Sequence, residues 1–431
     1  MLKIYTLFVR LFILVVTLLS TVFFSEALVA HDNSGAAIYV DVSSQAIRLE
    51  MEIPLSNLRH ELNRPAQGLF LEFPNPKVDE YARQHLSLYS KDRQPLTLEL
   101  RSTEVVNREG KDYQKIEVLA QLPEGTSSRE FVLDSDIIIH NRTDKHIMVF
   151  LRNDFESGKL ESVHLVNELS PNSHVLHFKL EEGHWFKGFK TSFLLGMNHI
   201  AEGTDHLLFL FTLLLTAGLL VHEGKVRTWA GIASPERTFK AIFVIVSAFT
   251  LGHSLTLFIG AIGLNILPSK WVETLIAASI LLTALHAIIP IFPKKEGWIA
   301  LGFGLIHGLG FASAIQDLGV QGQALFVTIL GFSFGIEFMQ GILIILTLPM
   351  IYSIYCGRFG TGMRRAGGVF AIVMAFAWLF ERLSDTELYA MKRFDELTYH
   401  GLWLLIGLVA LAILSRIVSD RRLESTFEAT K

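Results

Sequence analysis

Six side chains of the types that bind transition-metal ions lie in or beside long apolar runs of this chain. They are His199, Asp205, His206, His253, His307 and Glu337. An ionisable side chain near the centre of a bilayer costs several kcal/mol, so each of the six is a candidate for function. Glu202, at the outer end of its run, and His286, nearer the inner surface, are weaker candidates.

Counted inward along their runs, His206, His253, His307 and Glu337 all fall between the outer third and the middle of the membrane. We therefore expect them to meet around one site. Imidazole and carboxylate ligands together suit Ni²⁺, Co²⁺, Zn²⁺ or Cu²⁺ better than Ca²⁺ or Mg²⁺. The single cysteine, Cys356, excludes a thiolate cluster and a disulfide scaffold.

The stretch from His199 to His206 can be interpreted in two ways. On a continuous helix, His199, Glu202 and His206 share a face and Asp205 points roughly 120° away. His199 and His206 then lie about 10 Å apart along the helix axis, too far to hold one ion directly. Either the two imidazoles serve successive positions on a pathway, or the helix is broken near Gly203.

Each candidate also has a structural interpretation. Thr204 is a suitable cap for a helix that begins at Asp205, with the carboxylate favoured by the helix dipole. Neighbouring hydroxyl groups are able to satisfy the imidazole of His253, and the glycines beside His307 allow a histidine bond across closely packed helices. His286 is either structural or an exit ligand.

The composition divides the chain into two parts. The 431 residues have a mean hydropathy of +0.39, and residues 31–187 hold 43 of the 80 Asp, Glu, Lys and Arg residues. This shift predicts one region made for water and one made for lipid, and it excludes a soluble enzyme. The formal net charge of −4 excludes a strongly basic nucleic-acid binder.

The second part, residues 188–418, predicts a polytopic α-helical membrane protein with about seven transmembrane helices. The expected spans are 200–221, 239–262, 271–291, 298–317, 323–352, 366–383 and 399–418. Segments that this topology places inside carry thirteen Lys and Arg residues, whereas the outer loops among the spans carry four. The positive-inside rule then places the C-terminal tail, residues 419–431, in the cytoplasm. We expect the spans to lie in the plasma (inner) membrane.

The first part has a targeting segment and a strand-rich region. Residues 1–30 combine basic, apolar and small-residue features of a secretory signal peptide, although an uncleaved anchor helix is an alternative. Residues 31–187 predict an extracytoplasmic β-sandwich-like domain, with strands in Ala37–Ile53, Pro95–Leu100, Lys115–Leu122, Glu130–His140, His146–Arg152 and Ser173–Leu180.

This outer region is acidic and holds nine of the sixteen histidines. A solvated surface explains this composition better than a cation collector, because no pair of these histidines has a convincing ligand spacing along the chain. For example, His174 and His177 would point to opposite faces of a strand. The protein partner of the domain is not identified by the sequence.

The block His199-Ile-Ala-Glu-Gly-Thr-Asp205-His206 resembles the first membrane helix of the HupE/UreJ family, whose hallmark is a His, five residues and then Asp-His. The resemblance continues over residues 249–257, 272–280, 303–312 and 332–340, and it covers roughly 190–345. These hydrogenase- and urease-associated membrane proteins are regarded as nickel or cobalt permeases. Small members carry a second His and a Glu after the block of His307, where this chain has Phe311 and Ala314.

The resemblance therefore implies metal handling and leaves nickel itself open. Our first hypothesis is a permease for a divalent transition metal, nickel or cobalt before zinc, whose ligands are the residues named above. The alternatives are a membrane-embedded metallohydrolase with a catalytic Zn²⁺ and a non-catalytic assembly or sensor protein that binds partners through its β domain. We expect the bilayer and the metal ion as partners, and no nucleic acid.

Overall fold

The computed structural model describes most of the chain between residues 36 and 417. The gaps within that range are 62–75, 109, 124, 141–144, 225–226, 265–266, 358, 385, 387, 390, 392–393, 395–404 and 416. The predicted signal peptide (1–30), the tail (419–431) and part of the predicted span 399–418 lie outside the described residues.

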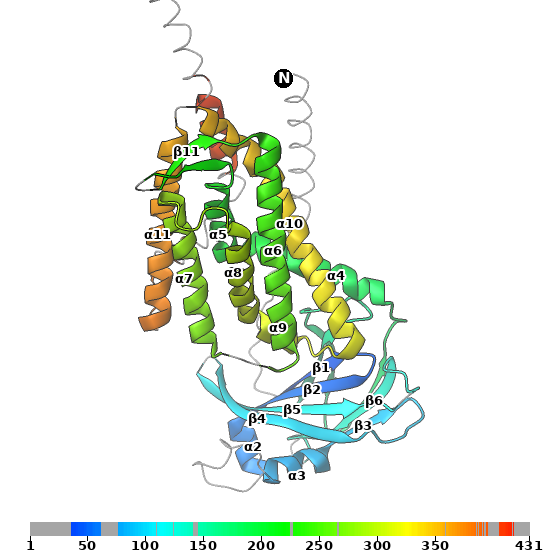
Figure 1. Ribbon diagram of the computed structural model, residues 1–431. Helices are drawn as coiled ribbons and strands as arrows, with labels where there is room; N and C mark the ends of the chain where they lie inside the picture. The colour runs from blue at the N-terminus through cyan, green and yellow to red at the C-terminus, as the bar shows by residue number, and fades with distance from the viewer. Residues whose placement is uncertain are drawn as a thin grey trace, which may run out of the picture. The chain divides into compact units, whose positions relative to one another are not determined.

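The N-terminal region is β-rich, as predicted, and its described residues form two sheets (Figure 1). The larger sheet has the strand order β4-β5-β2-β1-β7-β8, formed by β1 (Ala36–Val42), β2 (Ala46–Pro54), β4 (Leu98–Arg108), β5 (Lys111–Gln121), β7 (Ile147–Asp154) and β8 (His164–Leu169). The smaller sheet has the order β3-β6-β9, formed by β3 (Leu86–Ser90), β6 (Glu130–Ser135) and β9 (Val175–Lys179). Strand β1 pairs antiparallel with β2 and parallel with β7.

Side chains that alternate along these strands bury one face of each sheet. Ile38 and Val40 of β1 and Leu133 of β6 belong to one hydrophobic core that both sheets share. Helices α2 (Leu55–Glu61) and α3 (Pro76–His85) add Leu58 and Tyr81 to it. The predicted strand segment 37–53 is a β1–β2 hairpin, and β3 and β8 were not predicted from the sequence.

Within the described residues, four helices are long and apolar enough to cross a membrane. They are α6 (Pro235–Ala261), α7 (Ser269–Ile288), α10 (Gly322–Cys356) and α11 (Gly360–Ser384). They correspond to the predicted spans 239–262, 271–291, 323–352 and 366–383, so those four predictions are confirmed as long apolar helices. Ser234 caps α6, because its side chain accepts a hydrogen bond from the Arg237 amide.

Two of the other three predicted spans are interrupted in the part of the chain that the structure describes. Span 200–221 is divided at Gly203 between α4 (Trp185–Glu202) and α5 (Thr204–Leu214), followed by the hairpin of β10 (Leu219–His222) and β11 (Thr228–Ile232). Span 298–317 is divided at Phe311 between α8 (Glu296–Gly310) and α9 (Ala312–Asp317). In span 399–418 the described helix is Leu405–Ser415. An unbroken apolar run does not reveal such breaks.

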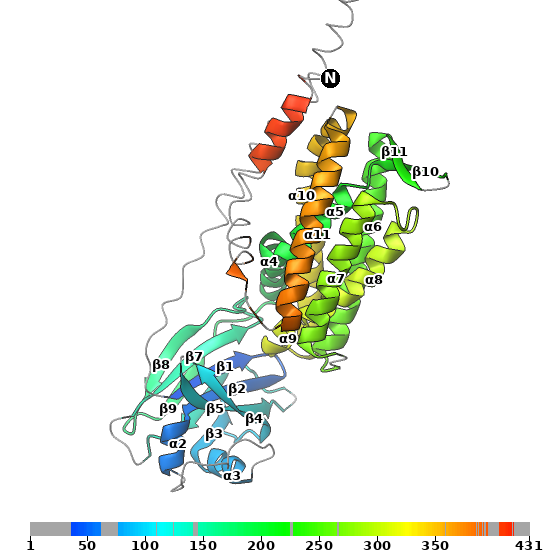
Figure 2. The same ribbon diagram turned by 90° about the vertical axis from the view of Figure 1, so that its left-hand side faces the viewer.

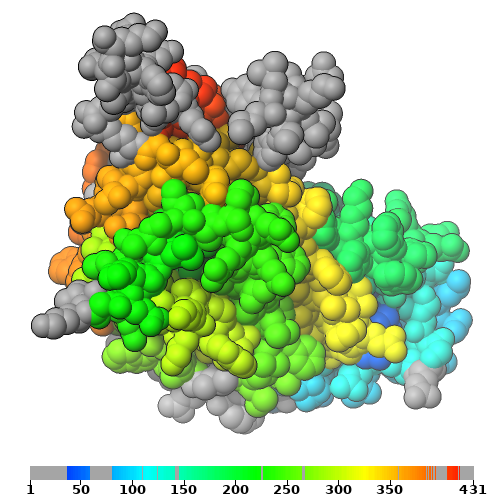
Figure 3. Space-filling view, turned by 45° about the horizontal axis from the view of Figure 1, so that its top comes forward, coloured from blue at the N-terminus to red at the C-terminus, as the bar shows by residue number. Residues whose placement is uncertain are grey.

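Glycines allow two pairs of helices to pack closely. A Cβ atom at Gly304 of α8 would collide with the carbonyl oxygen of Phe249 in α6, and one at Gly335 of α10 would collide with that of Phe193 in α4. Figure 2 shows α11 beside α7, and the space-filling view in Figure 3 shows α10 (yellow) against α4 (blue-green). These contacts fix the rotation of each helix and hence the directions of its polar side chains.

Candidate functional site

Four histidines from four helices come together in the apolar interior of the helical region. His206 of α5 is central: its ring centroid lies 4.6 Å from that of His199 in α4 and 5.1 Å from that of His307 in α8. The His253 ring of α6 lies 5.8 Å from His199 and 6.1 Å from His206. His206, His253 and His307 are buried and His199 is half-buried. The structure therefore brings three of the four side chains that we expected to converge to one place, with His199 added.

The break at Gly203 is what allows His199 and His206 to meet. Gly203 has an extended backbone (φ −72°, ψ 98°) and separates α4 from α5. A Cβ atom there would lie 2.6 Å from the His199 carbonyl oxygen and 3.0 Å from His206 Nδ1. Of the two sequence interpretations, the broken helix is the one observed. Thr204 is the first residue of α5 and not its cap.

Two overlapping groups of ligand atoms result. One nitrogen from each of His199, His206 and His253 lies within 4.8 Å of the others, and one ligand atom from each of Asp205, His206 and His307 does the same. Among the described residues, the buried Nε2 atoms of His199 and His206 have no hydrogen-bond partner. Both ring nitrogens of His253, and Nδ1 of His307, also have none.

Buried polar atoms without partners are rare in proteins and require an explanation. The hydroxyl interpretation of His253 does not supply one, because the Thr250 hydroxyl bonds to Gln340 and the Ser254 hydroxyl bonds to Ser333. A cation of the Ni²⁺, Co²⁺ or Zn²⁺ type would pair with these nitrogens, since neutral imidazole is a ligand that such ions prefer. The donor set thus fits a transition-metal ion.

Two hydrogen bonds orient rings of the cluster. Nδ1 of His206 lies 2.8 Å from Oδ1 of Asp205, and Nε2 of His307 lies 3.0 Å from the Ser279 hydroxyl on α7. Such bonds to one ring nitrogen select the tautomer and direct the other nitrogen toward an ion. Asp205, which a continuous helix would have turned away, is thus adjacent to the cluster because α5 begins at Thr204.

Aromatic rings enclose the cluster, and their role was not predicted from the sequence. Phe311 lies 4.4 Å from the His199 ring and stacks on Phe332 at 4.9 Å. Phe249 and Phe209 lie 5.2 Å and 5.5 Å from the His307 ring. Their rings exclude water and lower the local polarity, which strengthens electrostatic contacts to a bound cation. The only sequence signal was the position of Phe311 at the end of the His307 block.

The structure does not bring Glu337, Glu202 or His286 into either group of ligand atoms. Glu337 accepts a hydrogen bond of 2.5 Å from the Ser247 hydroxyl, at the interface of α10 with α6. Glu202 is exposed at the end of α4. His286 is buried with Nδ1 accepting bonds from the amides of Ile291 and Phe292, so it stabilises the turn after α7. Helix rotation, which the sequence leaves open, separates these residues from the cluster.

Glu337 instead belongs to a series of polar pairs between α6 and α10. Ser254 bonds to Ser333 at 2.6 Å, Thr250 to Gln340 at 3.1 Å, and Ser247 to Glu337. Because His253 is next to Ser254 in the chain, the series begins beside the histidine cluster. It extends about 10 Å along α6 toward Pro235, as the seven residues from 254 to 247 rise about 1.5 Å each. The series therefore starts one residue away from His253 along α6.

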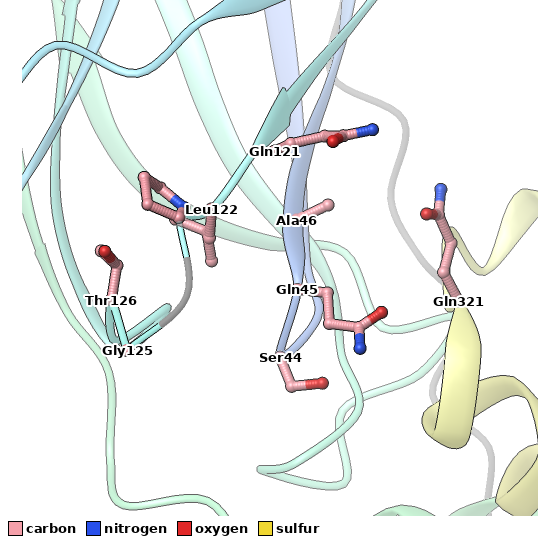
Figure 4. Close-up of a pocket in the computed structure, with 9 residues that line it drawn as sticks. Ser44, Gln45, Ala46, Gln121, Leu122, Gly125, Thr126 and Gln321 are labelled. Carbon is pink, nitrogen blue, oxygen red and sulfur yellow. The ribbon is translucent and has the colours of Figure 1, made fainter.

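A surface pocket of about 420 Å³ lies elsewhere, between the β1–β2 turn and the end of β5 (Figure 4). The described residues of its lining include the amide side chains of Gln45, Gln121 and Gln321 and contribute no imidazole or carboxylate. The histidine cluster, where imidazoles from four helices converge, remains the candidate site.

Comparisons with known proteins agree with this location. Residues 176–382 match the family described as HupE / UreJ protein. The match begins before α4, continues through α10 and includes nearly all of α11. It therefore contains every member of the histidine cluster. No curated protein and no solved structure matches the chain.

Proposed function

Since residues 176–382 belong to the HupE/UreJ family, we propose that this membrane protein is a permease for a divalent transition-metal ion, nickel or cobalt before zinc. The observation that carries the proposal is the convergence of four imidazoles on one another, with nitrogens that lack partners among the described residues. The ion is the cargo, so the site must bind it and also release it.

The ligands of the site suit an ion that must be both bound and released. Neutral nitrogens of His199, His206 and His253 replace water around the ion, and Asp205 supplies one negative charge beside the cluster. A site with a single carboxylate binds a divalent ion less tightly than one with several, which favours release. Both groups include His206, so we propose that an ion passes from the first group toward His307 by way of this residue.

The polar pairs between α6 and α10 are the proposed continuation of the path. Ser254, Thr250 and Ser247 offer hydroxyl oxygens in succession, and Glu337 adds a carboxylate near the end of the series. Oxygen ligands hold Ni²⁺ or Co²⁺ more weakly than imidazoles do, so the ion would be released along this series. A path that leads away from the histidines supports transport over a closed catalytic pocket.

We propose a plasma-membrane location with the β-rich region outside and the C-terminus in the cytoplasm. The support is the Lys and Arg distribution and the signal-like residues 1–30. A negative potential inside would draw a divalent cation inward by about 4.6 kcal/mol per 100 mV. The sequence has no G-x-x-x-x-G-K-[ST] loop, and we propose that the potential or the ion gradient drives uptake.

The test is the metal content of cells that express the protein, measured for a panel of Ni²⁺, Co²⁺ and Zn²⁺. The variants are Asp205→Ala and His206→Ala, and the control is His222→Ala, which removes an exposed histidine of β10. We expect the wild type and the control to raise the content of one or two ions, and the two site variants to lose the increase. Equal contents in all four strains would remove the permease proposal.

The runner-up is a membrane-embedded metallohydrolase. The group of His199, His206 and His253 would leave a fourth position open on a zinc ion, as catalytic sites do. That function requires hydrolysis that depends on His206 with unchanged metal content in the cells. An assembly or sensor protein would show neither, and His206→Ala would leave uptake untouched.

A further inference from the structure

A second group of metal-binding side chains lies in the β-rich region, apart from the helical site. One ligand atom from each of His85, Asp136 and His140 lies within 4.8 Å of the other two, and all three residues are half-buried. We propose that these residues form a separate binding site for a divalent transition-metal ion.

The strand register places the first two ligands side by side. His85 ends α3 and directly precedes β3, and Asp136 directly follows β6. Leu86 pairs with Ser135 in the antiparallel β3–β6 ladder, so His85 and Asp136 are the next residues opposite each other. The Asp136 amide donates to the His85 carbonyl oxygen at 3.2 Å, and His85 Nδ1 lies 2.9 Å from Asp136 Oδ1.

A tight turn returns His140 to the same place. The Asp136 carbonyl oxygen accepts bonds from the amides of Ile139 and His140, both at 3.0 Å. The His140 ring then stacks on the His85 ring, with centroids 4.1 Å apart and planes inclined by 20°. Two imidazoles that are 55 positions apart in the sequence thus share one carboxylate neighbour.

The turn is strained and firmly held. Ile138 has φ of +59°, a left-handed conformation that is an outlier for a β-branched residue. Its amide donates to the Tyr81 hydroxyl at 3.0 Å, and Ile137, Ile138 and Ile139 are all buried. The Tyr81 ring also lies 4.6 Å from the His85 ring. Strain of this kind is concentrated at functional sites, where packing maintains it.

Two imidazoles and one carboxylate prefer Ni²⁺, Co²⁺, Zn²⁺ or Cu²⁺ to Ca²⁺ or Mg²⁺. Ligand atoms around a tetrahedral ion lie about 3.3 Å apart, given metal–nitrogen distances of about 2.0 to 2.1 Å. In this structure the three ligand atoms lie within 4.8 Å of one another, and the side chains of Asp136 and His140 would turn toward the ion when it binds. Water has access to such side chains and completes the coordination, so we expect reversible binding.

The β-rich region contains a natural control. His174 also pairs with a carboxylate, with Nδ1 2.8 Å from Asp134 Oδ1. Among the described residues, however, this pair is not part of a group of three ligands. A carboxylate–imidazole pair alone therefore does not distinguish the proposed site. The third ligand, His140, does.

If the proposed function is correct, this site would collect the ion on the outer side before it enters the helices. That role rests on the proposed function, whereas the binding itself does not. The test is therefore made in a background that lacks the helical site, His206→Asn with His253→Asn. Binding in this background reports on the β-rich region whether or not the protein transports metal.

The experiment measures Co²⁺ bound to the detergent-solubilised full chain, by equilibrium dialysis and by visible absorption. We expect the background protein to bind one Co²⁺, and His140→Gln or Asp136→Asn to weaken that binding at least tenfold. His174→Gln should leave it unchanged. Equal Co²⁺ binding by the His140→Gln, His174→Gln and background proteins would overturn the proposal.

A second measurement needs no substitution at the site. Diethyl pyrocarbonate modifies accessible imidazoles, and mass spectrometry reports each modified histidine. In the wild-type protein, Co²⁺ should protect His85 and His140 and leave His174 reactive. Equal modification of His85 and His140 with and without Co²⁺ would contradict the proposal, even if a variant had failed to fold.

Discussion

His199 and His206 face each other across the break at Gly203, with ring centroids 4.6 Å apart. A continuous helix would have separated them by about 10 Å along its axis. The hallmark spacing of a His, five residues and Asp-His thus becomes a site only because the helix stops and restarts between its members. The predictions below follow from this arrangement and from its surroundings.

Gly203→Ala tests the break. The new Cβ would lie 2.6 Å from the His199 carbonyl oxygen, closer than real Cβ contacts allow, so the backbone around the break must shift and disturb the alignment of the two histidines. We expect Co²⁺ affinity of the helical site to fall about tenfold, equivalent to about 1.4 kcal/mol. Gly302→Ala in α8 is the control, because its Cβ would meet nothing within 4 Å. Unchanged Co²⁺ affinity in Gly203→Ala would show that the break does not position the ligands.

Phe311→His tests the balance between binding and release. Phe311 lies 4.4 Å from the His199 ring, so an imidazole in its place adds a ligand to the cluster. We expect Co²⁺ to bind about tenfold more tightly to the purified protein and cellular uptake to become slower, because a tighter site releases its ion more slowly. Phe311→Leu keeps the apolar contact and should not tighten binding. Faster uptake by Phe311→His would argue against release as the limiting step.

Glu337→Gln separates binding from passage. Glu337 lies outside both ligand groups and accepts a bond from Ser247, in the polar series between α6 and α10. The substitution should leave Co²⁺ affinity near that of the wild type and reduce the initial rate of uptake about tenfold. Glu236→Gln removes an exposed carboxylate at the start of α6 and should change neither quantity. A loss of affinity in Glu337→Gln would place this residue in the binding site after all.

Glu50→Gln tests how acid affects the β-rich region. Burial tends to raise the Glu50 pKa, but Arg152, Lys115 and Arg48 outweigh burial and hold it below its ordinary value of 4.5. The unfolded chain therefore binds this proton more readily than the folded chain does. Glu50 thus stabilises the fold above about pH 4.5, and this contribution is lost as the pH falls below that value.

At pH 7, Glu50→Gln should destabilise the β-rich region by about 1 to 3 kcal/mol, because charged hydrogen bonds to Arg152 are lost. The difference between the variant and the wild type should shrink as the pH falls below about 4.5. The measurement is the protease resistance of residues 36–180 in the full chain across this pH range. Glu99→Gln, which breaks an exposed pair with Arg101, is the control and should have little effect. A constant difference between pH 3 and pH 7 would contradict this account.

The sequence by itself identified the membrane region, four of its long helices and the histidines that meet in the candidate site. Membrane-spanning helices can be recognised from long apolar runs such as 239–262, because a helix must be about 20 residues long to cross the bilayer. His206, His253 and His307 stand out in the sequence because an ionisable side chain within such a run is costly to place in a bilayer. Their order and spacing also predicted the resemblance to the HupE/UreJ family, whose model matches residues 176–382.

The tertiary structure decided which of these residues meet. Whether a helix breaks at Gly203 or at Phe311 depends on what the neighbouring helices contact, and this is not a property of the local sequence. The rotation of α10, set by its packing on α4 and α6, directs Glu337 to Ser247 and away from the histidines. In the β-rich region, no local spacing marks His85 as a neighbour of Asp136 and His140. Their proximity arises from the β3–β6 register and the turn at Ile138, because long-range pairing brings together residues that are distant in sequence.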